Sequence, residues 1–251
     1  MGSMTDRVVL ITGGGSGIGL AIARRLVQED AAVILNGRDE GKLQQAVEAI
    51  SKEGGICVEA PGDITDEAKV QEVVEIAVGA FGRLDSLVNN AGAAVRNLPA
   101  DKTSAADWDA MQDVNLRAAW MTSRLAVEEM RRCGEGVILN IASNLGVVGL
   151  PGMAGYMAAK GGLMSLTRSM AIDYGSEGIR VNCLCPGLVR TAMTETLPDF
   201  AEKQDFYTSR APLGRIGTPE DVAGLAAFLL GPESSWVTGQ SIVVDGGYTI
   251  Q

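Results

Sequence analysis

Short apolar segments alternate with longer amphipathic segments along the whole chain. About seven apolar runs of strand length predict β-strands at residues 7–12, 31–36, 56–60, 84–88, 137–141, 179–185 and 241–244. Apolar residues at helical spacing predict helices at residues 20–27, 40–53, 69–81, 104–132, 156–174 and 219–230. Strands that alternate with helices are typical of the α/β class. We therefore expect a single doubly wound, mostly parallel, Rossmann-like sheet with helices on both faces.

The alternation indicates one domain. The sequence contains no internal repeat, low-complexity tract or linker that would divide it, so residues 5–251 are expected to fold together. The first four residues, Met-Gly-Ser-Met, are interpreted as an expression scar and are left out of this domain.

Residues suited to a nucleotide follow the carboxyl ends of the predicted strands. Residues 13–19 form a glycine-rich turn between the first strand and the next helix, which aims backbone N–H groups and a helix N-terminus at a phosphate. Asp63, Asn90, Ser143 and Gly187 follow later strands. Ligands of open parallel sheets bind at this edge, where Asp63 could accept a hydrogen bond from an adenine amino group. Because all these residues follow the carboxyl ends of predicted strands, the sequence predicts an enzyme that binds a nucleotide.

The end of the second strand bears on which nucleotide is bound. NAD-binding versions of this unit carry an acidic residue near here, but the sequence has Gly37 followed by Arg38. A guanidinium group is planar and always charged, which suits a 2′-phosphate. We therefore predict NADP(H), with NAD(H) as the alternative; the competing interpretation is that Arg38 is a solvated loop residue.

Three further side chains are suited to carbonyl chemistry. Tyr156 and Lys160 are four residues apart, so a helix places them on one face. A free tyrosine has a pKa of about 10, and a neighbouring ammonium group would lower it toward neutrality. Ser143 could then hydrogen-bond the substrate oxygen, while Asn115, in the middle of a predicted helix, could meet a buried polar need. Taken alone, a Tyr–Lys pair at this spacing is usually just a solvated helix face.

Composition excludes several alternatives. The chain has no histidine, which removes Ser-His-Asp hydrolysis, histidine-based zinc sites and imidazole acid–base chemistry. The net charge of −10 disfavours nucleic acids and anionic membranes as partners. Four cysteines without a C-x-x-C pattern are expected to be core thiols. No apolar run reaches the length of a membrane span and no secretory signal is recognised, so a cytoplasmic location is expected.

Taken together, these motifs resemble the short-chain dehydrogenase/reductase family, in its compact single-domain branch. The resemblance rests on T-G-x-x-x-G-x-G from residue 12, N-N-A-G at 89–92, Y-x-x-x-K at 156–160, and Pro186-Gly187. It implies that Tyr156 transfers a proton to or from the substrate oxygen, and that Ser143 orients that oxygen. It further implies that Lys160 lowers the pKa of the tyrosine and binds the nicotinamide ribose, and that Asn115 holds a water molecule in a proton relay.

The resemblance also implies the remaining contacts and partners. Cofactor contacts are expected at Gly13, Ser16, Gly17, Ile18, Gly19, Arg38, Asp63, Ile64, Asn90, Ala91, Gly92, Tyr156, Lys160, Pro186, Gly187, Val189 and Thr191. No metal ion is expected to take part. A homo-oligomer, a tetramer or a dimer, is expected to form through the helices around Trp108 and Tyr156 and the last strand.

The expected function is NADP(H)-dependent interconversion of a ketone and a secondary alcohol. One alternative is a 3-oxoacyl-carrier-protein reductase, although residues 169–173 lack the basic residue that often docks the acidic carrier, while Arg131 and Arg132 remain. A second alternative is a non-enzymatic nucleotide-binding redox sensor. The substrate pocket is expected among residues 94–97, 144–150 and 188–207.

Overall fold

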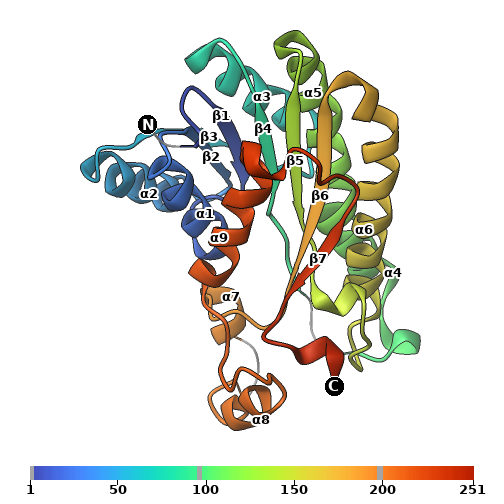
Figure 1. Cartoon of the computed structure of the whole chain (residues 1–251). Coiled ribbons are helices and arrows are strands. Elements are labelled where there is room, and N and C mark those ends of the chain that lie inside the picture. The colour runs from blue at the N-terminus through green and yellow to red at the C-terminus, as the bar shows by residue number, and fades with distance from the viewer. Residues whose placement is uncertain (1–2, 95–97, 197–199) are drawn as a thin grey trace.

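The computed structural model describes residues 3–94, 98–196 and 200–251. Seven parallel strands form one sheet in the order β3-β2-β1-β4-β5-β6-β7 (Figure 1). The strands are β1 (Val8–Thr12), β2 (Ala32–Gly37), β3 (Ile56–Pro61), β4 (Ser86–Asn89), β5 (Gly136–Ile141), β6 (Ile179–Pro186) and β7 (Ser241–Val244). The predicted doubly wound α/β fold is confirmed, and the expected "mostly parallel" sheet is entirely parallel among these strands.

Helices cover both faces of the sheet because each strand is apolar on both sides. On one face, α1 (Gly17–Val27), α2 (Glu40–Lys52) and α9 (Pro219–Leu230) share an apolar core with Val9 and Ile11 of β1. On the other face, α3 (Glu67–Phe81), α5 (Ala118–Cys133) and α6 (Ala154–Tyr174) share a second apolar core with Val8 and Leu10. Figure 1 shows these two layers on either side of the strands. Alternate residues of one short strand therefore serve two separate apolar cores.

The single helix expected over residues 104–132 is wrong in one respect. The structure has α4 (Ala105–Gln112), then a π-helical turn over residues 113–117, then α5. Buried Asn115 lies in that turn, and its Nδ2 donates to Met111 O at 3.1 Å and to Ala93 O at 2.9 Å. The side chain competes for a carbonyl that an α-helix would use, which favours the wider turn.

The structure adds Met4 to the folded domain. Its side chain is 1% exposed and belongs to the core beneath α1 and α9, and its amide donates to Glu29 O. Asp66 caps α3 by accepting the N–H of Ala68. Within the described ranges, no helix has the length and apolar character that a membrane span requires.

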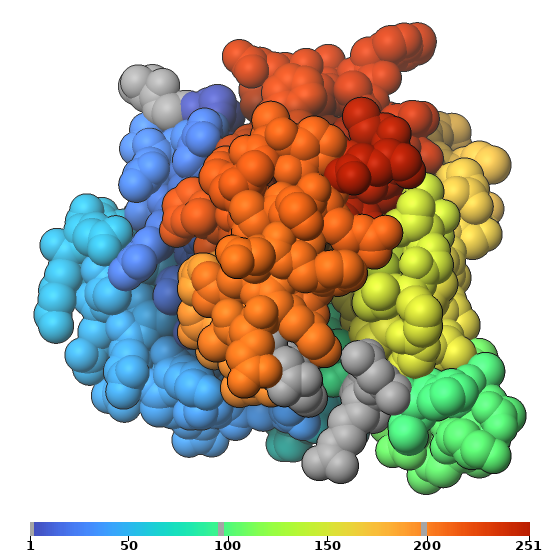
Figure 2. Space-filling view, turned by 90° about the horizontal axis from the view of Figure 1, so that it is seen from below, coloured from blue at the N-terminus to red at the C-terminus, as the bar shows by residue number. Residues whose placement is uncertain are grey.

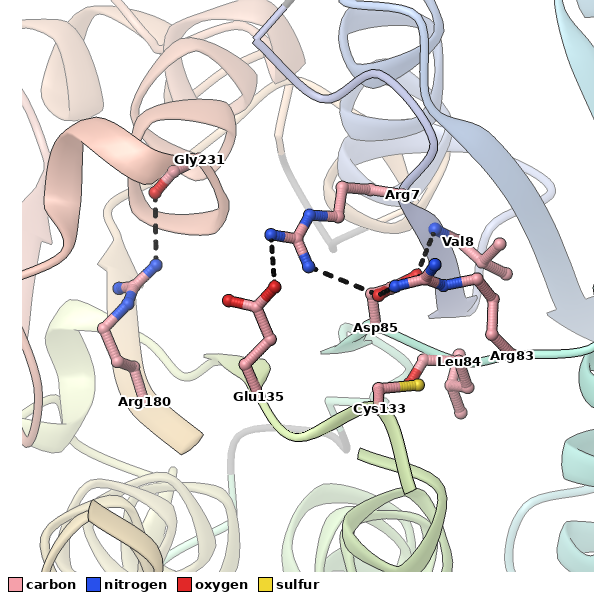
Figure 3. Close-up of polar contacts among 9 residues, drawn as sticks. All are labelled: Arg7, Val8, Arg83, Leu84, Asp85, Cys133, Glu135, Arg180 and Gly231. Carbon is pink, nitrogen blue, oxygen red and sulfur yellow. Dashed lines mark hydrogen bonds and ion pairs between the residues drawn. The ribbon is translucent and has the colours of Figure 1, made fainter. Parts of the chain in front are cut away.

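The buried carboxylate of Asp85 connects the N-terminal ends of β1, β4 and β5, at the edge of the sheet opposite the predicted site. The side chain of Asp85 is fully buried and accepts hydrogen bonds from Arg83 and from the N–H of Val8, the latter at 2.9 Å. Arg7 lies 3.3 Å from the same carboxylate and 2.7 Å from Glu135 (Figure 3). Because a buried charge is costly unless it is paired, these contacts form a structural clamp.

We expect Asp85→Ala to lower the free energy of unfolding by about 2 kcal/mol, less than for a fully buried pair because both arginines are partly exposed. Urea denaturation measures the change. Asp101→Ala, which removes an exposed pair with Lys102, is the matched control and should change stability by less than about 0.5 kcal/mol. Equal effects of the two substitutions would contradict the clamp.

Candidate active site

The carboxyl ends of the strands border one elongated cleft of about 650 Å³. It extends from Arg38 and Asp63 past the glycine turn to Ser143, Tyr156 and Lys160. Figure 2 shows this edge of the molecule face-on: later residues, in orange, lie across it between the blue N-terminal half and the yellow-green residues after β5. Its volume is within the range of small-molecule and cofactor sites.

The glycine turn is built for close approach. Gly13 has a φ of +65°, and a Cβ there would lie 3.0 Å from the Cα of Ala91. The amide of Asn90 holds the turn, since its Nδ2 donates to Thr12 O at 3.0 Å and Gly13 O at 3.1 Å. The Ser16 side chain makes no capping bond, so it leaves the first N–H groups of α1 directed at the cleft. This cradle fits a dinucleotide phosphate.

Gly19 has a different position from the one predicted. Unlike the other predicted contact residues, it does not line the cleft. A Cβ at Gly19 would lie 2.5 Å from Gly13 O and 2.6 Å from Asn90 Nδ2. The structure therefore places Gly19 behind the turn, where only a glycine lets α1 pack against it.

Arg38 and Asp63 lie together at one end of the cleft. Arg38 Nη1 is 3.7 Å from Asp63 Oδ2, and the Arg38 side chain is 79% exposed. Partial burial disfavours the charge of Asp63, but hydrogen bonds from Thr65 and the charge of Arg38 outweigh it and hold the pKa of Asp63 below its usual value. The carboxylate is therefore ionised, and the guanidinium group has room to bind a ligand.

The predicted catalytic side chains converge at the other end. Lys160 is buried, and its Nζ donates to Ile141 O at 2.9 Å and lies 5.7 Å from the ring centroid of Tyr156. Ser143 follows β5 and accepts the N–H of Leu145 at 3.1 Å. Asn115 approaches from the π-helical turn, where its Oδ1 accepts the N–H of Ala93. Elements distant in sequence therefore meet around the phenol, which borders the cleft.

The pKa values differ from the sequence expectation. Burial lowers the pKa of Lys160 to about 8. Burial also raises the pKa of Tyr156, and a hydrogen bond with Ser143 only partly opposes that effect. The expected lowering of the tyrosine pKa by Lys160 is therefore not found in the protein alone, where burial is the largest influence on the phenol.

Several cleft residues escaped the sequence analysis. Ala93, Ala110, Met111 and Val114 line the cleft from the chain around the π-helical turn, and the periodicity shows only apolar helix positions for the last three. Met193 also lines the cleft and lies within the expected pocket range 188–207. Conversely, the expected pocket residues 144–150 do not line it. The expected positions 95–97 and 197–199 lie outside the described residues.

The comparisons with known proteins agree with this geometry. Residues 13–249 match the family model described as enoyl-(acyl carrier protein) reductase. The chain is 40% identical to 2-(S)-hydroxypropyl-CoM dehydrogenase 3 of Xanthobacter autotrophicus, over 98% of each chain. It is 39% identical to the 3-oxoacyl-(acyl-carrier-protein) reductase FabG of Thermotoga maritima, over 98% of this chain and 99% of that one. The crystal structure of levodione reductase superposes with a TM-score of 0.95 at 34% identity, over 98% of this chain and 99% of that chain.

A Rossmann-like sheet whose cleft unites a phosphate cradle with a tyrosine and a lysine defines a nucleotide-dependent oxidoreductase. The chain belongs to the short-chain dehydrogenase/reductase family, whose members bind an NAD(P) nucleotide and act on small alcohols and ketones.

We expect Gly92→Ala to disrupt the site. Its new methyl carbon would lie 2.8 Å from Asn115 Oδ1 and 3.4 Å from Lys160 Nζ. Displacement of these groups should weaken NAD(P)H binding about tenfold, as measured by nucleotide fluorescence titration. Gly79→Ala is the control, because a Cβ at that helical position meets nothing within 4 Å. It should leave binding unchanged and add about 0.5–1 kcal/mol of stability; equal affinities in the two variants would contradict the proposed geometry.

Proposed function

We propose that the protein is an NADP(H)-dependent oxidoreductase that interconverts a ketone and a secondary alcohol, with Tyr156 as the general acid and base. The observation that carries the proposal is the convergence of Ser143, Tyr156, Lys160 and Asn115 on the cleft that also contains the glycine turn. A protein that only binds a nucleotide has no evident need for all four groups. This argues against the redox-sensor alternative.

The dinucleotide would lie along the cleft, with its phosphates at the glycine turn and its nicotinamide end near Tyr156 and Lys160. The nicotinamide, when bound, supplies or accepts the hydride. Ser143 and Tyr156 are close enough to share a hydrogen bond, so both can hold one substrate oxygen. Lys160 is fixed by Ile141 O and has donors left for a ribose hydroxyl.

The protonation state of Tyr156 suits carbonyl reduction. With its pKa raised above the ordinary value, the phenol is protonated at neutral pH and can donate to a developing alkoxide. Lys160, with a pKa of about 8, is mostly an ammonium at that pH and favours the phenolate that remains after the transfer. Alcohol oxidation needs the deprotonated phenol and is therefore favoured at higher pH.

Asn115 is proposed to support this proton transfer. Its two amide hydrogens bind Ala93 O and Met111 O, and its Oδ1 accepts one backbone N–H. One acceptor position of Oδ1 is left for a water molecule. Such a water would lie near Lys160, since both side chains approach Gly92.

NADP(H) is favoured over NAD(H) by the end of β2. Gly37 leaves no carboxylate there for a ribose 2′-hydroxyl, and Arg38 is exposed at the rim with only a 3.7 Å pair to Asp63. A 2′-phosphate would offer that guanidinium two charge-assisted hydrogen bonds.

The 3-oxoacyl-carrier-protein reductase alternative is supported by the FabG relative but less by the charges of this chain. The net charge of −10 opposes an acidic carrier. Arg131 and Arg132 are engaged by Glu177 and Glu129, respectively. A small ketone or cyclic alcohol is therefore the preferred substrate class, in keeping with the levodione reductase neighbour.

A homo-oligomer is proposed from exposed apolar side chains on α4, α5 and α6. Trp108 is 40%, Trp120 44% and Ile172 82% exposed. Large apolar side chains left exposed on these helices favour association with another copy.

We expect Tyr156→Phe to lower ketone reduction at least about 100-fold, because it removes the donated proton but keeps the ring. NADPH oxidation with a panel of ketones and diketones measures the turnover, and fluorescence titration measures NADPH binding, which should stay within about twofold. Unchanged turnover in the variant would end the assignment of Tyr156, and a wild-type protein that reduces none of the panel would contradict the proposed function.

We expect Arg38→Glu to raise the KM for NADPH more than tenfold and to change that for NADH by less than about threefold, because only NADPH presents a phosphate to this residue. Lys52→Glu reverses a charge at the exposed end of α2 and is the matched control. Equal effects of Arg38→Glu on both cofactors would remove the cofactor assignment.

A further inference from the structure

We propose that Asp245 is a positioning residue that couples the segment covering the cleft to the turn that carries Ser143. The covering segment is defined here as residues 189–196 and 200–213. Asp245 follows β7, the last strand, and is not among the described residues that line the cleft. The inference rests on the proposed function, because the turn it would hold is the one that orients the substrate oxygen.

One side of the coupling is the catalytic turn. Asn144 is buried, and its Nδ2 donates to Asp245 Oδ2 at 3.3 Å. The carbonyl of Asn144 in turn accepts the N–H groups of Val147 and Val148, which close a helical turn directly after Ser143. Asp245 therefore holds the residue that follows Ser143 in the chain, and through it the orientation of the Ser143 backbone.

The other side is the C-terminal loop. Asp245 Oδ1 accepts the N–H of Gly247, and Oδ2 accepts the N–H of Thr249, both at 2.9 Å. Asp245 also packs closely against Gly187, the residue that follows β6: a Cβ on Gly187 would lie 2.6 Å from the Cβ of Asp245. One carboxylate thus satisfies three N–H donors from two separate parts of the chain, a set that only a residue with two acceptor oxygens can match.

The C-terminal loop is in turn fastened to the covering segment. Leu213 N donates to Gly246 O at 3.1 Å, and the Gln251 side chain donates to Arg210 O. The Arg210 guanidinium lies 5.5 Å from the ring centroid of Tyr248. Figure 2 shows the dark red C-terminal residues against both the orange covering segment and the yellow-green residues that follow β5.

The covering segment reaches the site at its other end. Thr191, Ala192, Met193 and Thr194 line the cleft. Arg190 joins this part to the remainder, since its Nη2 lies 3.4 Å from Gln204 Oε1 and its guanidinium lies 5.7 Å from the ring centroid of Phe200. A continuous set of contacts therefore runs from the wall of the cleft through the C-terminal loop to Asp245, and from there to the turn that carries Ser143.

The test compares Asp245→Ala and Asp245→Asn with wild type. In Asp245→Ala we expect kcat for ketone reduction to fall about tenfold, since small displacements of a positioning group are costly, while the Kd for NADPH stays within about twofold. In Asp245→Asn we expect kcat to fall less, because the Asn144 amide can flip and form a hydrogen bond with the new amide. One backbone N–H would then face an NH2 group.

The matched control is Ser234→Ala, which removes two buried hydrogen bonds at the opposite edge of the sheet. It should lower stability without changing kcat. Hydrogen exchange provides a readout that needs no substrate: amides of residues 144–148 and 207–213 should exchange at least about fivefold faster in Asp245→Ala and at wild-type rates in Ser234→Ala.

Faster exchange in both segments together with a lower kcat supports the coupling. Exchange that rises only at residues 246–251, or a kcat that matches the Ser234→Ala control, overturns it. If the wild type reduces no ketone, the proposed function fails, and the exchange result alone decides whether Asp245 links the two segments.

Discussion

The hydrogen bond from the Lys160 ammonium to Ile141 O is the interaction on which the site depends. It ties the first turns of α6 to the carboxyl end of β5 and places Tyr156 one helical turn away, at the cleft. Because the ammonium is buried, breaking this bond would leave a charge without a partner in the protein interior. The same burial lowers the pKa of Lys160 to about 8, so the lysine serves both as an anchor for the fold and as a titratable group in the site.

Behind that bond, a series of buried polar side chains crosses the sheet. Asn89 Nδ2 donates to Ser123 Oγ of α5 and to Asn140 Oδ1 of β5, and Asn140 Nδ2 donates to Thr167 Oγ1 of α6. These bonds link two helices through two strands immediately below the site. Asn89 Oδ1 has no hydrogen-bond partner among the described residues, but the paired groups favour a single arrangement of their elements, which keeps the Tyr156 helix in register with the strands.

The two ends of the cleft are built differently. The end at the glycine turn consists of backbone turns and glycines whose positions follow from close packing, as the 3.0 Å approach of a Gly13 Cβ to Ala91 illustrates. The end near Tyr156 is lined by side chains such as Met111 of α4, Val114 of the π-helical turn and Met193 of the short helix at 192–195. Side chains can change on such a wall without altering the backbone turns at the other end, and relatives of this chain are named for substrates as different as a 3-oxoacyl carrier protein and levodione.

The sequence by itself determined the order of strands and helices, because each apolar run and each amphipathic period reports local geometry. It also determined which chemical groups are present: the glycine turn, Tyr156 and Lys160 at helical spacing, and no histidine. Only the tertiary structure decided what depends on contacts between distant residues. Burial raises the pKa of Tyr156, and Asn115 favours a π-helical turn where a continuous helix was expected. Gly19 packs behind the glycine turn and does not line the cleft. Desolvation, competition for a carbonyl and close packing all depend on neighbours far away in the chain, which no local pattern records.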